Sequence, residues 1–168
     1  MDLVKVKNMK KVIIIGCPGS GKSTFARKLS QKTGLPLFYL DMIYHKPDKT
    51  TVTKEEFDAK LSSILQKDAW IIDGNYMRTI PIRVRACDTV IWLDYKAEVC
   101  LQGIHERRGK PREDMPWVES EPDEEFLRFV ENFTSESKPL IQDVLEQYKD
   151  KNIIVFHTRE ESEHFLLT

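Results

Sequence analysis

Residues 16–23, which read Gly-Cys-Pro-Gly-Ser-Gly-Lys-Ser, carry the most specific chemical signal in the chain. Their spacing, G-x-x-x-x-G-K-[ST], lets the backbone turn tightly, so that successive N–H groups point into one concavity where phosphate binds. In such a loop the lysine reaches the β- and γ-phosphates of a nucleoside triphosphate, and the serine hydroxyl ligates Mg²⁺. We therefore expect a nucleotide site built from Gly16, Cys17, Pro18, Gly19, Ser20, Gly21, Lys22, Ser23 and Thr24.

A second candidate is Asp73, which ends the apolar run 70–73 and is followed by Gly74. An aspartate at the end of a buried strand beside such a loop can hold Mg²⁺ through water. The alternative is a turn-forming aspartate before a glycine. Motor ATPases usually place a glutamate directly after this aspartate to activate water. Its absence here favours phosphoryl transfer to a substrate over hydrolysis, and the lack of an N-K-x-D motif favours ATP over GTP.

The elements that must position these residues alternate along the chain. Short apolar runs rich in β-branched residues predict strands, and apolar residues recurring three and four positions apart predict helices. The expected strands are 11–16, 37–40, 70–73, 89–93 and 153–156. The expected helices are 21–33, a stretch behind a capping box at 53–56, 97–108, 122–133, 140–148 and 160–167, with a loop at 42–52.

This alternation predicts a single α/β domain over residues 1–168, with a mostly parallel five-stranded sheet and right-handed crossovers. Pro139 either kinks one long helix or divides two. The aromatic stripe of Phe126, Phe129 and Phe133 recurs at helical spacing, and we interpret it as part of the core rather than as a cofactor site.

Composition limits the classes of function. Formal net charge is −1, with 40 % apolar and 32 % charged residues, which argues against direct DNA binding and membrane association. The three cysteines, at 17, 87 and 100, fit neither a metal site nor a disulfide framework and predict reduced thiols. With no apolar leader in the first residues, we expect a cytoplasmic protein, either a monomer or a homodimer.

The order of motifs resembles the adenylate-kinase-like branch of P-loop kinases. Residues 16–41 look like the opening of shikimate, adenylate and related small-molecule kinases, and WIIDGNY at 70–76 resembles a segment of the nucleotide kinases. More narrowly, the chain resembles bacterial DNA topology modulation proteins, which are associated with flagellar regulation. The motifs shared with that group are Leu40-Asp41, Asp73-Gly-Asn-Tyr76, Val90-Ile-Trp-Leu-Asp94 and Arg112-Glu-Asp-Met115. The likeness covers nearly the whole chain and implies a P-loop NTPase fold that uses ATP and Mg²⁺.

On the acceptor side, the resemblance implies that Asp41 orients the acceptor hydroxyl and acts as its base. Ligands of open α/β sheets bind at the edge where this second strand ends, and the alternative is a turn-starting aspartate. Tyr44 and His45 follow in the chain and are candidates for the pocket wall. For His45 the alternative is a solvated loop residue.

Further acceptor contacts are expected after the third strand, from Asn75, Tyr76 and Arg78. Related kinases grip an anionic acceptor with an arginine in this region, and Arg78 is our choice. The alternative is an exposed basic face that Arg78 forms with Arg83 and Arg85.

A lid is implied at about residues 107–122, with Arg107 and Arg112 as phosphate contacts and a plain basic loop as the alternative. A mobile arginine lid neutralises charge in phosphoryl transfer and excludes water. The narrower group has Gly-Cys-x-Glu after the lid arginines, whereas this chain has Trp117-Val-Glu-Ser120. Arg159 follows the last strand, where related kinases pack adenine, and is expected to stack on the base.

Three functions therefore compete. The first is a kinase that transfers the ATP γ-phosphoryl group to a small-molecule acceptor, with Lys22, Asp41, Asp73, Arg107 and Arg112 as catalytic residues. The second is an ATP-binding regulator that affects DNA topology, for which basic residues within 5–11 and 105–112 are the candidate contacts. The third is a slow ATPase without an acceptor.

Overall fold

The computed structural model describes residues 8–119 and 121–168. Lys5 and Lys7, two of the candidate DNA contacts, and Ser120 of the predicted lid lie outside these ranges. The strands are β1 (Lys11–Gly16), β2 (Leu37–Tyr39), β3 (Trp70–Asp73), β4 (Thr89–Leu93) and β5 (Asn152–Phe156). The helices are α2 (Lys22–Thr33), α3 (Leu40–Tyr44), α4 (Lys54–Leu65), η1 (Met77–Thr79), α5 (Ile80–Ala86), α6 (Ala97–Arg107), α7 (Glu124–Glu131), α8 (Phe133–Glu136), α9 (Lys138–Glu146) and α10 (Arg159–Leu167).

As predicted, the five strands form one parallel sheet. Their order in the sheet is β2-β3-β1-β4-β5. The central strand β1 pairs with β3 on one side and with β4 on the other. Because strands buried on both faces must be apolar throughout, β1 and β4 read as continuous runs of Val, Ile, Leu and Trp. The loop after β1 therefore leaves the middle of the sheet at its carboxyl edge.

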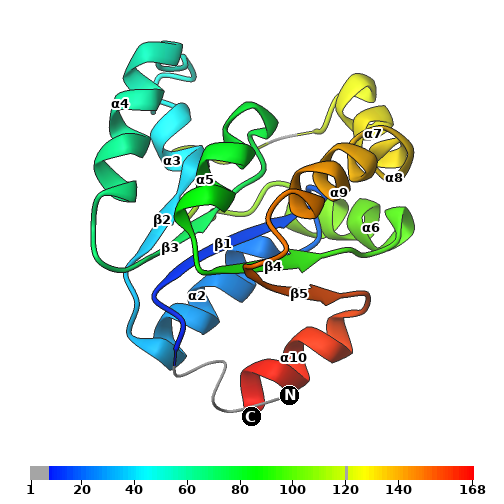
Figure 1. Ribbon diagram of the computed structural model, residues 1–168. Coiled ribbons are helices and arrows are strands. Elements are labelled where there is room, and N and C mark those ends of the chain that lie inside the picture. The colour runs from blue at the N-terminus through cyan, green and yellow to red at the C-terminus, as the bar shows by residue number, and fades with distance from the viewer. Residues whose placement is uncertain (1–7, 120) are drawn as a thin grey trace.

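Helices cover both faces of the sheet (Figure 1). On one face α2 packs against β1, β2 and β3, and α10 packs against α2 and β5. On the opposite face α5 packs against β1 and α9. The sheet residues between these layers, including Ile13, Ile14, Ile71 and Ile91, are completely buried and form the core.

Most predicted elements are present, and the differences lie in the second strand and in the short helices α3, α5, α8 and η1. The second strand ends at Tyr39, and residues 40–44 form helix α3 where the sequence predicted the end of a strand and a loop. Helix α5 was not predicted because its run of seven residues is too short to show periodicity. Pro139 divides two helices, since it occupies the first turn of α9, where proline is tolerated.

Among the described helices, none is both long enough and apolar enough to span a lipid bilayer. The three cysteines are free thiols, and all of them are buried.

Candidate active site

The phosphate loop, residues 16–23, leaves β1 and enters α2. Gly19 and Gly21 have φ angles of 86° and 94°, in the left-handed region that favours glycine. A hydrogen bond from the Ser20 backbone N–H to the Cys17 carbonyl (3.0 Å) closes the turn. Because α2 begins at Lys22, the first N–H groups of the helix have no intrahelical acceptor and remain available to an anion.

The side chain of Asn75 clamps the first residue of this loop. Its Oδ1 accepts a hydrogen bond from the Gly16 backbone N–H (3.0 Å), and its Nδ2 donates to the Gly16 carbonyl (2.6 Å). Gly16 is buried, so both of its backbone groups need a protein partner. The amide of Asn75, a predicted substrate contact, is therefore occupied by the loop backbone.

Arg83 in turn holds the segment that carries Asn75. Its side chain is completely buried, and its guanidinium donates to the carbonyls of Gly74 (2.9 Å), Asn75 and Tyr76 (3.3 Å). Burial lowers the pKa of Arg83, whereas three carbonyl acceptors favour its protonated form. Arg83 is therefore a positioning residue and not part of an exposed basic face.

A cleft of about 650 Å³ opens beside the phosphate loop. Most of the residues predicted for the site line this one cleft: Pro18, Gly19, Gly21, Lys22, Ser23, Thr24, Asp41, Asp73, Asn75, Tyr76, Arg107, Arg112 and Arg159. The donor loop and three of the predicted acceptor residues, Asp41, Asn75 and Tyr76, therefore line the same cleft.

Asp73 ends β3 and is only 6 % exposed. Its Oδ1 is buried and has no hydrogen-bond partner within the described part of the chain. Burial raises the pKa of Asp73 to about 7, although the charge of Lys22 opposes the rise, and Asp41 adds to it. A buried carboxylate oxygen with an unused acceptor site fits a hydrated Mg²⁺, whose waters donate hydrogen bonds. Ser23, the other predicted metal ligand, lines the same cleft.

Asp41 lies in the first turn of α3, not at the end of a strand as predicted. The Tyr76 hydroxyl donates to Asp41 Oδ1 over 2.6 Å. Burial and the charge of Asp41 raise the pKa of Tyr76, so the phenol stays a donor at neutral pH. This bond fixes a carboxylate on the wall of the cleft, where it can accept a proton from a hydroxyl.

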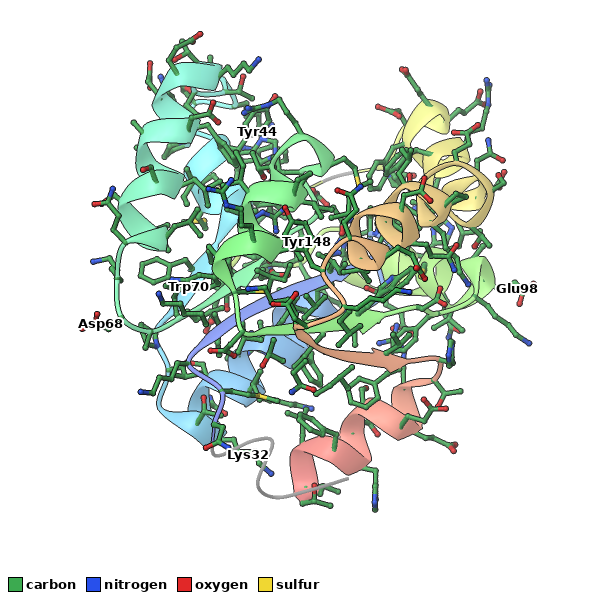
Figure 2. The ribbon with its side chains drawn as sticks, viewed as in Figure 1. Lys32, Tyr44, Asp68, Trp70, Glu98 and Tyr148 are labelled. Atoms are coloured by element: carbon green, nitrogen blue, oxygen red, sulfur yellow. The ribbon has the colours of Figure 1, made fainter. Side chains whose placement is uncertain are left out.

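The structure does not bring Arg78 or Tyr44 into this cleft. Arg78 forms a two-point ion pair with Asp58 of α4 (2.7 and 3.1 Å), and its side chain is 46 % exposed. Tyr44, labelled in Figure 2, packs edge-on against Tyr76 with ring centres 5.4 Å apart. Arg78 and Tyr44 line a separate pocket of about 420 Å³ behind Tyr76. In this structure Arg78 therefore lies outside the cleft, and its role as a grip for an anionic acceptor stays a prediction.

Arg107 and Arg112 lie in the cleft and pair with acidic residues from the same segment. Arg112 Nη2 lies 3.1 Å from Glu119, and Arg112 Nε lies 3.6 Å from Asp114. Arg107 Nε lies 3.8 Å from Glu119, beyond hydrogen-bond range, and is a buried donor with no partner among the residues described. Burial lowers the pKa of Arg107. A phosphate oxygen would supply the missing acceptor.

The segment around Trp117 contacts the end of α3. This segment has Trp117-Val-Glu-Ser120 in place of the Gly-Cys-x-Glu of the DNA topology modulation proteins. The ring of Trp117 lies edge-on to His45 at 5.7 Å, and the Lys49 ammonium lies 5.6 Å from its centre. His45 itself lines the cleft rather than standing in solvent. A hydrogen bond from Gly109 N–H to the Glu119 carbonyl (2.8 Å) joins the two ends of the segment.

The predicted aromatic core stripe is shared between the core and the cleft. Phe133 is buried as predicted, and Phe126 packs against the core and also lines the cleft, whereas Phe129 lines the cleft and is 42 % exposed. Helical periodicity identifies the apolar face of α7, but it does not separate a face that packs on the core from one at a pocket rim. The only sequence signal for a cleft role of Phe126 and Phe129 was the length of the aromatic stripe, which exceeds what the core can bury.

Arg159, the first residue of α10, contacts the phosphate loop, and Cys17 is a residue of the loop itself. The Arg159 guanidinium donates to the carbonyls of Gly19 and Ser20 (both 3.2 Å) and lies 5.7 Å from the Tyr95 ring centre. Its donors therefore support the loop, and the predicted stacking of Arg159 on adenine stays a prediction. The Cys17 side chain is buried, and its hydrogen bond with the neighbouring Cys100 thiol together with burial raises its pKa. A nucleotide contact by Cys17 stays a prediction.

Helix α6 packs directly on the loop through glycine. A Cβ at Gly19 would lie 2.0 Å from the Cys100 carbonyl oxygen, and a Cβ at Gly103 would lie 2.0 Å from the Gly19 carbonyl oxygen. No side chain fits at either position without moving backbone. The loop and the middle of α6 are therefore in backbone contact.

No protein-family model and no curated protein matches the sequence. Solved structures with the same fold include a shikimate kinase from Acinetobacter baumannii in complex with shikimate, with a TM-score of 0.60 and 17 % identity over 97 % of this chain and 94 % of that chain. They also include a shikimate kinase from Bacteroides thetaiotaomicron, with a TM-score of 0.57 and 14 % identity over 95 % of each chain. At this identity the likeness concerns the fold: the chain has the P-loop kinase fold of the shikimate kinases.

Proposed function

We propose that this protein is a P-loop kinase that transfers the γ-phosphoryl group of ATP to a hydroxyl of a small molecule. One observation carries the proposal: a single cleft holds the phosphate loop with Lys22 and, beyond Asp73, the carboxylate of Asp41. A hydrolase needs only the first of these, whereas phosphoryl transfer needs both. The fold shared with shikimate kinases agrees with this proposal.

In this proposal the chain binds the triphosphate through the loop backbone and Lys22. Ser23 and Asp73 would hold Mg²⁺, which neutralises negative charge on the phosphates when bound. Asp41, held by Tyr76, orients the acceptor hydroxyl and takes its proton as the new bond to phosphorus forms. Gly74 stands where a water-activating glutamate would favour hydrolysis.

Residues 107–122 act as the lid of the single domain in this proposal. Arg107 and Arg112 now face Glu119 and Asp114, and they exchange these carboxylates for phosphate oxygens when the nucleotide binds. The acidic partners hold the two guanidinium groups in the cleft before binding, so little side-chain entropy is lost at that step.

Membership in the DNA topology modulation group rests on motif order alone and stays a proposal. A cytoplasmic location belongs with it and is supported by three buried free thiols, which suit a reducing compartment.

The test is to incubate the protein and Mg-ATP with nucleosides, nucleotides, sugars and ring alcohols, and to measure ADP formation. We expect at least one acceptor to raise ADP formation tenfold or more, and Lys22→Ala to abolish the increase. Lys28→Ala, which changes a lysine on the same helix α2, is the matched control and should retain full activity. Hydrolysis that no acceptor stimulates would identify a slow ATPase and contradict the proposal.

A further inference from the structure

We propose that the acceptor half of the cleft takes an uncharged alcohol that carries a planar ring, such as a nucleoside, and rejects the phosphorylated or carboxylated forms of such compounds. The inference rests on the proposed kinase function and names the acceptor class. It comes from the charges and the apolar surface that line the cleft beyond the phosphate loop.

The first observation is the balance of charge. The cleft is lined by four cationic residues and five acidic residues: Lys22, Arg107, Arg112 and Arg159 against Asp41, Asp73, Glu106, Asp114 and Glu119. A nucleoside triphosphate adds further negative charge and uses the lysine of the loop. An acceptor that itself carried a phosphate or carboxylate would enter a site already rich in negative charge.

The second observation is that the arginines near the acceptor side are already engaged. Arg78 points away and pairs with Asp58, and the donors of Arg83 are taken by backbone carbonyls. Arg112 lies between Asp114 and Glu119. In the proposed function Arg107 and Arg112 exchange their carboxylate partners for phosphate oxygens of the nucleotide, and Arg159 donates to the carbonyls of the phosphate loop. Within residues 8–119 and 121–168, this leaves no arginine of the cleft for an anionic acceptor. Because arginine forms strong charge-assisted hydrogen bonds to phosphate and carboxylate, the acceptor side lacks the group that best suits an anion.

The third observation is apolar surface opposite Asp41. Phe126 and Phe129 reach the cleft from α7, and Met77 and Met115 line it as well. The Phe129 ring is 42 % exposed and meets Phe133 edge-on, with ring centres 5.9 Å apart, so its outer face is open to a ligand. Figure 1 shows α3 and α7 on opposite sides of the edge where the strands of the sheet end. A planar ring between them would remove this apolar surface from water.

These observations together give the acceptor a defined orientation. The hydroxyl of the ligand meets the Asp41 carboxylate, which Tyr76 holds in place, and the ring of the ligand covers Phe129. The oxygen of that hydroxyl forms the bond to the γ-phosphorus, the bond to the β-γ bridging oxygen breaks, and Asp41 receives the proton. The products are ADP and a phosphate monoester.

A binding measurement tests the acceptor class without relying on turnover. The protein is saturated with Mg²⁺ and β,γ-imido-ATP, and heat of binding is measured for five nucleosides, their 5′-monophosphates and shikimate. We expect at least one nucleoside to bind tenfold or more tightly than its own monophosphate. A monophosphate or shikimate that binds more tightly than every nucleoside would overturn the inference, and so would a lack of binding by all nucleosides.

Variants test the orientation. For the nucleoside that binds, Phe129→Ala should raise its dissociation constant tenfold or more and leave that of the ATP analogue within twofold. Leu140→Ala, which removes an exposed apolar side chain on α9 outside the cleft, is the matched control and should change neither constant. Phe129→Arg places a cation on the wall and should reduce or reverse the preference against the monophosphate. A Phe129→Ala variant that weakens only the ATP analogue would assign this wall to the donor and overturn the inference.

Turnover separates this inference from the function on which it rests. A nucleoside that binds but receives no phosphoryl group leaves the acceptor-class inference standing and removes the kinase proposal. Phosphoryl transfer to monophosphates in preference to nucleosides confirms a kinase and overturns the acceptor class.

Discussion

Asn75→Ala isolates the contact that fixes the phosphate loop to β3. The substitution removes two hydrogen bonds and leaves the N–H and C=O of Gly16 without their partners. Each buried polar group left unpaired costs about 1–3 kcal/mol. Since Asn75 is partly exposed to the cleft, water recovers part of this loss, and we expect a decrease of about 3 kcal/mol in the free energy of unfolding. We also expect nucleotide affinity to fall, because Gly16 begins the phosphate loop.

The assay is urea unfolding at pH 7.5, monitored by circular dichroism, together with titration of β,γ-imido-ATP into each variant. Gln142→Ala, which truncates an exposed amide on α9, is the matched control and should change stability by less than about 0.5 kcal/mol. We expect the Asn75→Ala variant to bind the analogue at least tenfold more weakly. A stability loss below about 1 kcal/mol with unchanged affinity would refute the role of this clamp, because two buried groups would then have been left unpaired at almost no cost.

Three other perturbations have definite expected outcomes. Gly103→Ala places a Cβ 2.0 Å from the Gly19 carbonyl oxygen and should cost at least about 2 kcal/mol in chemical unfolding, whereas Gly34→Ala, where no atom lies within 4 Å, should cost only about 1 kcal/mol through its left-handed φ. Equal losses would contradict the steric argument. For Asp73, burial raises the folded-state pKa from 3.8 to about 7, so the folded state binds more protons than the unfolded state between these values, and the stability of the nucleotide-free protein falls as pH rises through this window. Asp73→Asn should remove up to about 4 kcal/mol of that fall. If the wild-type protein and the variant lose the same stability between pH 4 and 7.5, the raised pKa of Asp73 is contradicted. Arg78→Ala breaks an exposed ion pair and should leave the melting temperature and the acceptor KM nearly unchanged, whereas a tenfold rise in KM would show that Arg78 contacts the acceptor.

The sheet and the phosphate loop could be predicted because their sequence signals are local. β1 is a continuous β-branched run, and the glycine spacing of residues 16–23 permits few other conformations. Asp41 and Asp73 could be placed near the loop because parallel strands end at one edge of a sheet. These predictions needed only the periodicity of each segment and the direction of the chain.

The roles of the arginines depend on contacts distant in sequence, which no local pattern contains. Arg78 and Arg83 lie only five positions apart in the sequence. Arg78 pairs with Asp58 on the surface, whereas Arg83 is completely buried and donates to backbone carbonyls. Phe129 shares the helical spacing of Phe133, but α7 ends at the rim of the cleft, so one ring meets the core and the other meets the opening. Such differences follow from tertiary packing, which overrides the local pattern.

The glycine contact between α6 and the phosphate loop has a mechanical consequence. Gly19 and Gly103 bring two backbones together with no side chain between them, so α6 cannot slide or roll without displacing the loop. Any movement of the lid must therefore begin after the last turn of α6. Gly109, which has a left-handed φ of 73° and open space around it, lies at this point. Helix α6 therefore stays fixed relative to the phosphate loop. Arg107, in the last turn of α6, keeps its position beside the nucleotide site while the part of the lid that follows Gly109 moves.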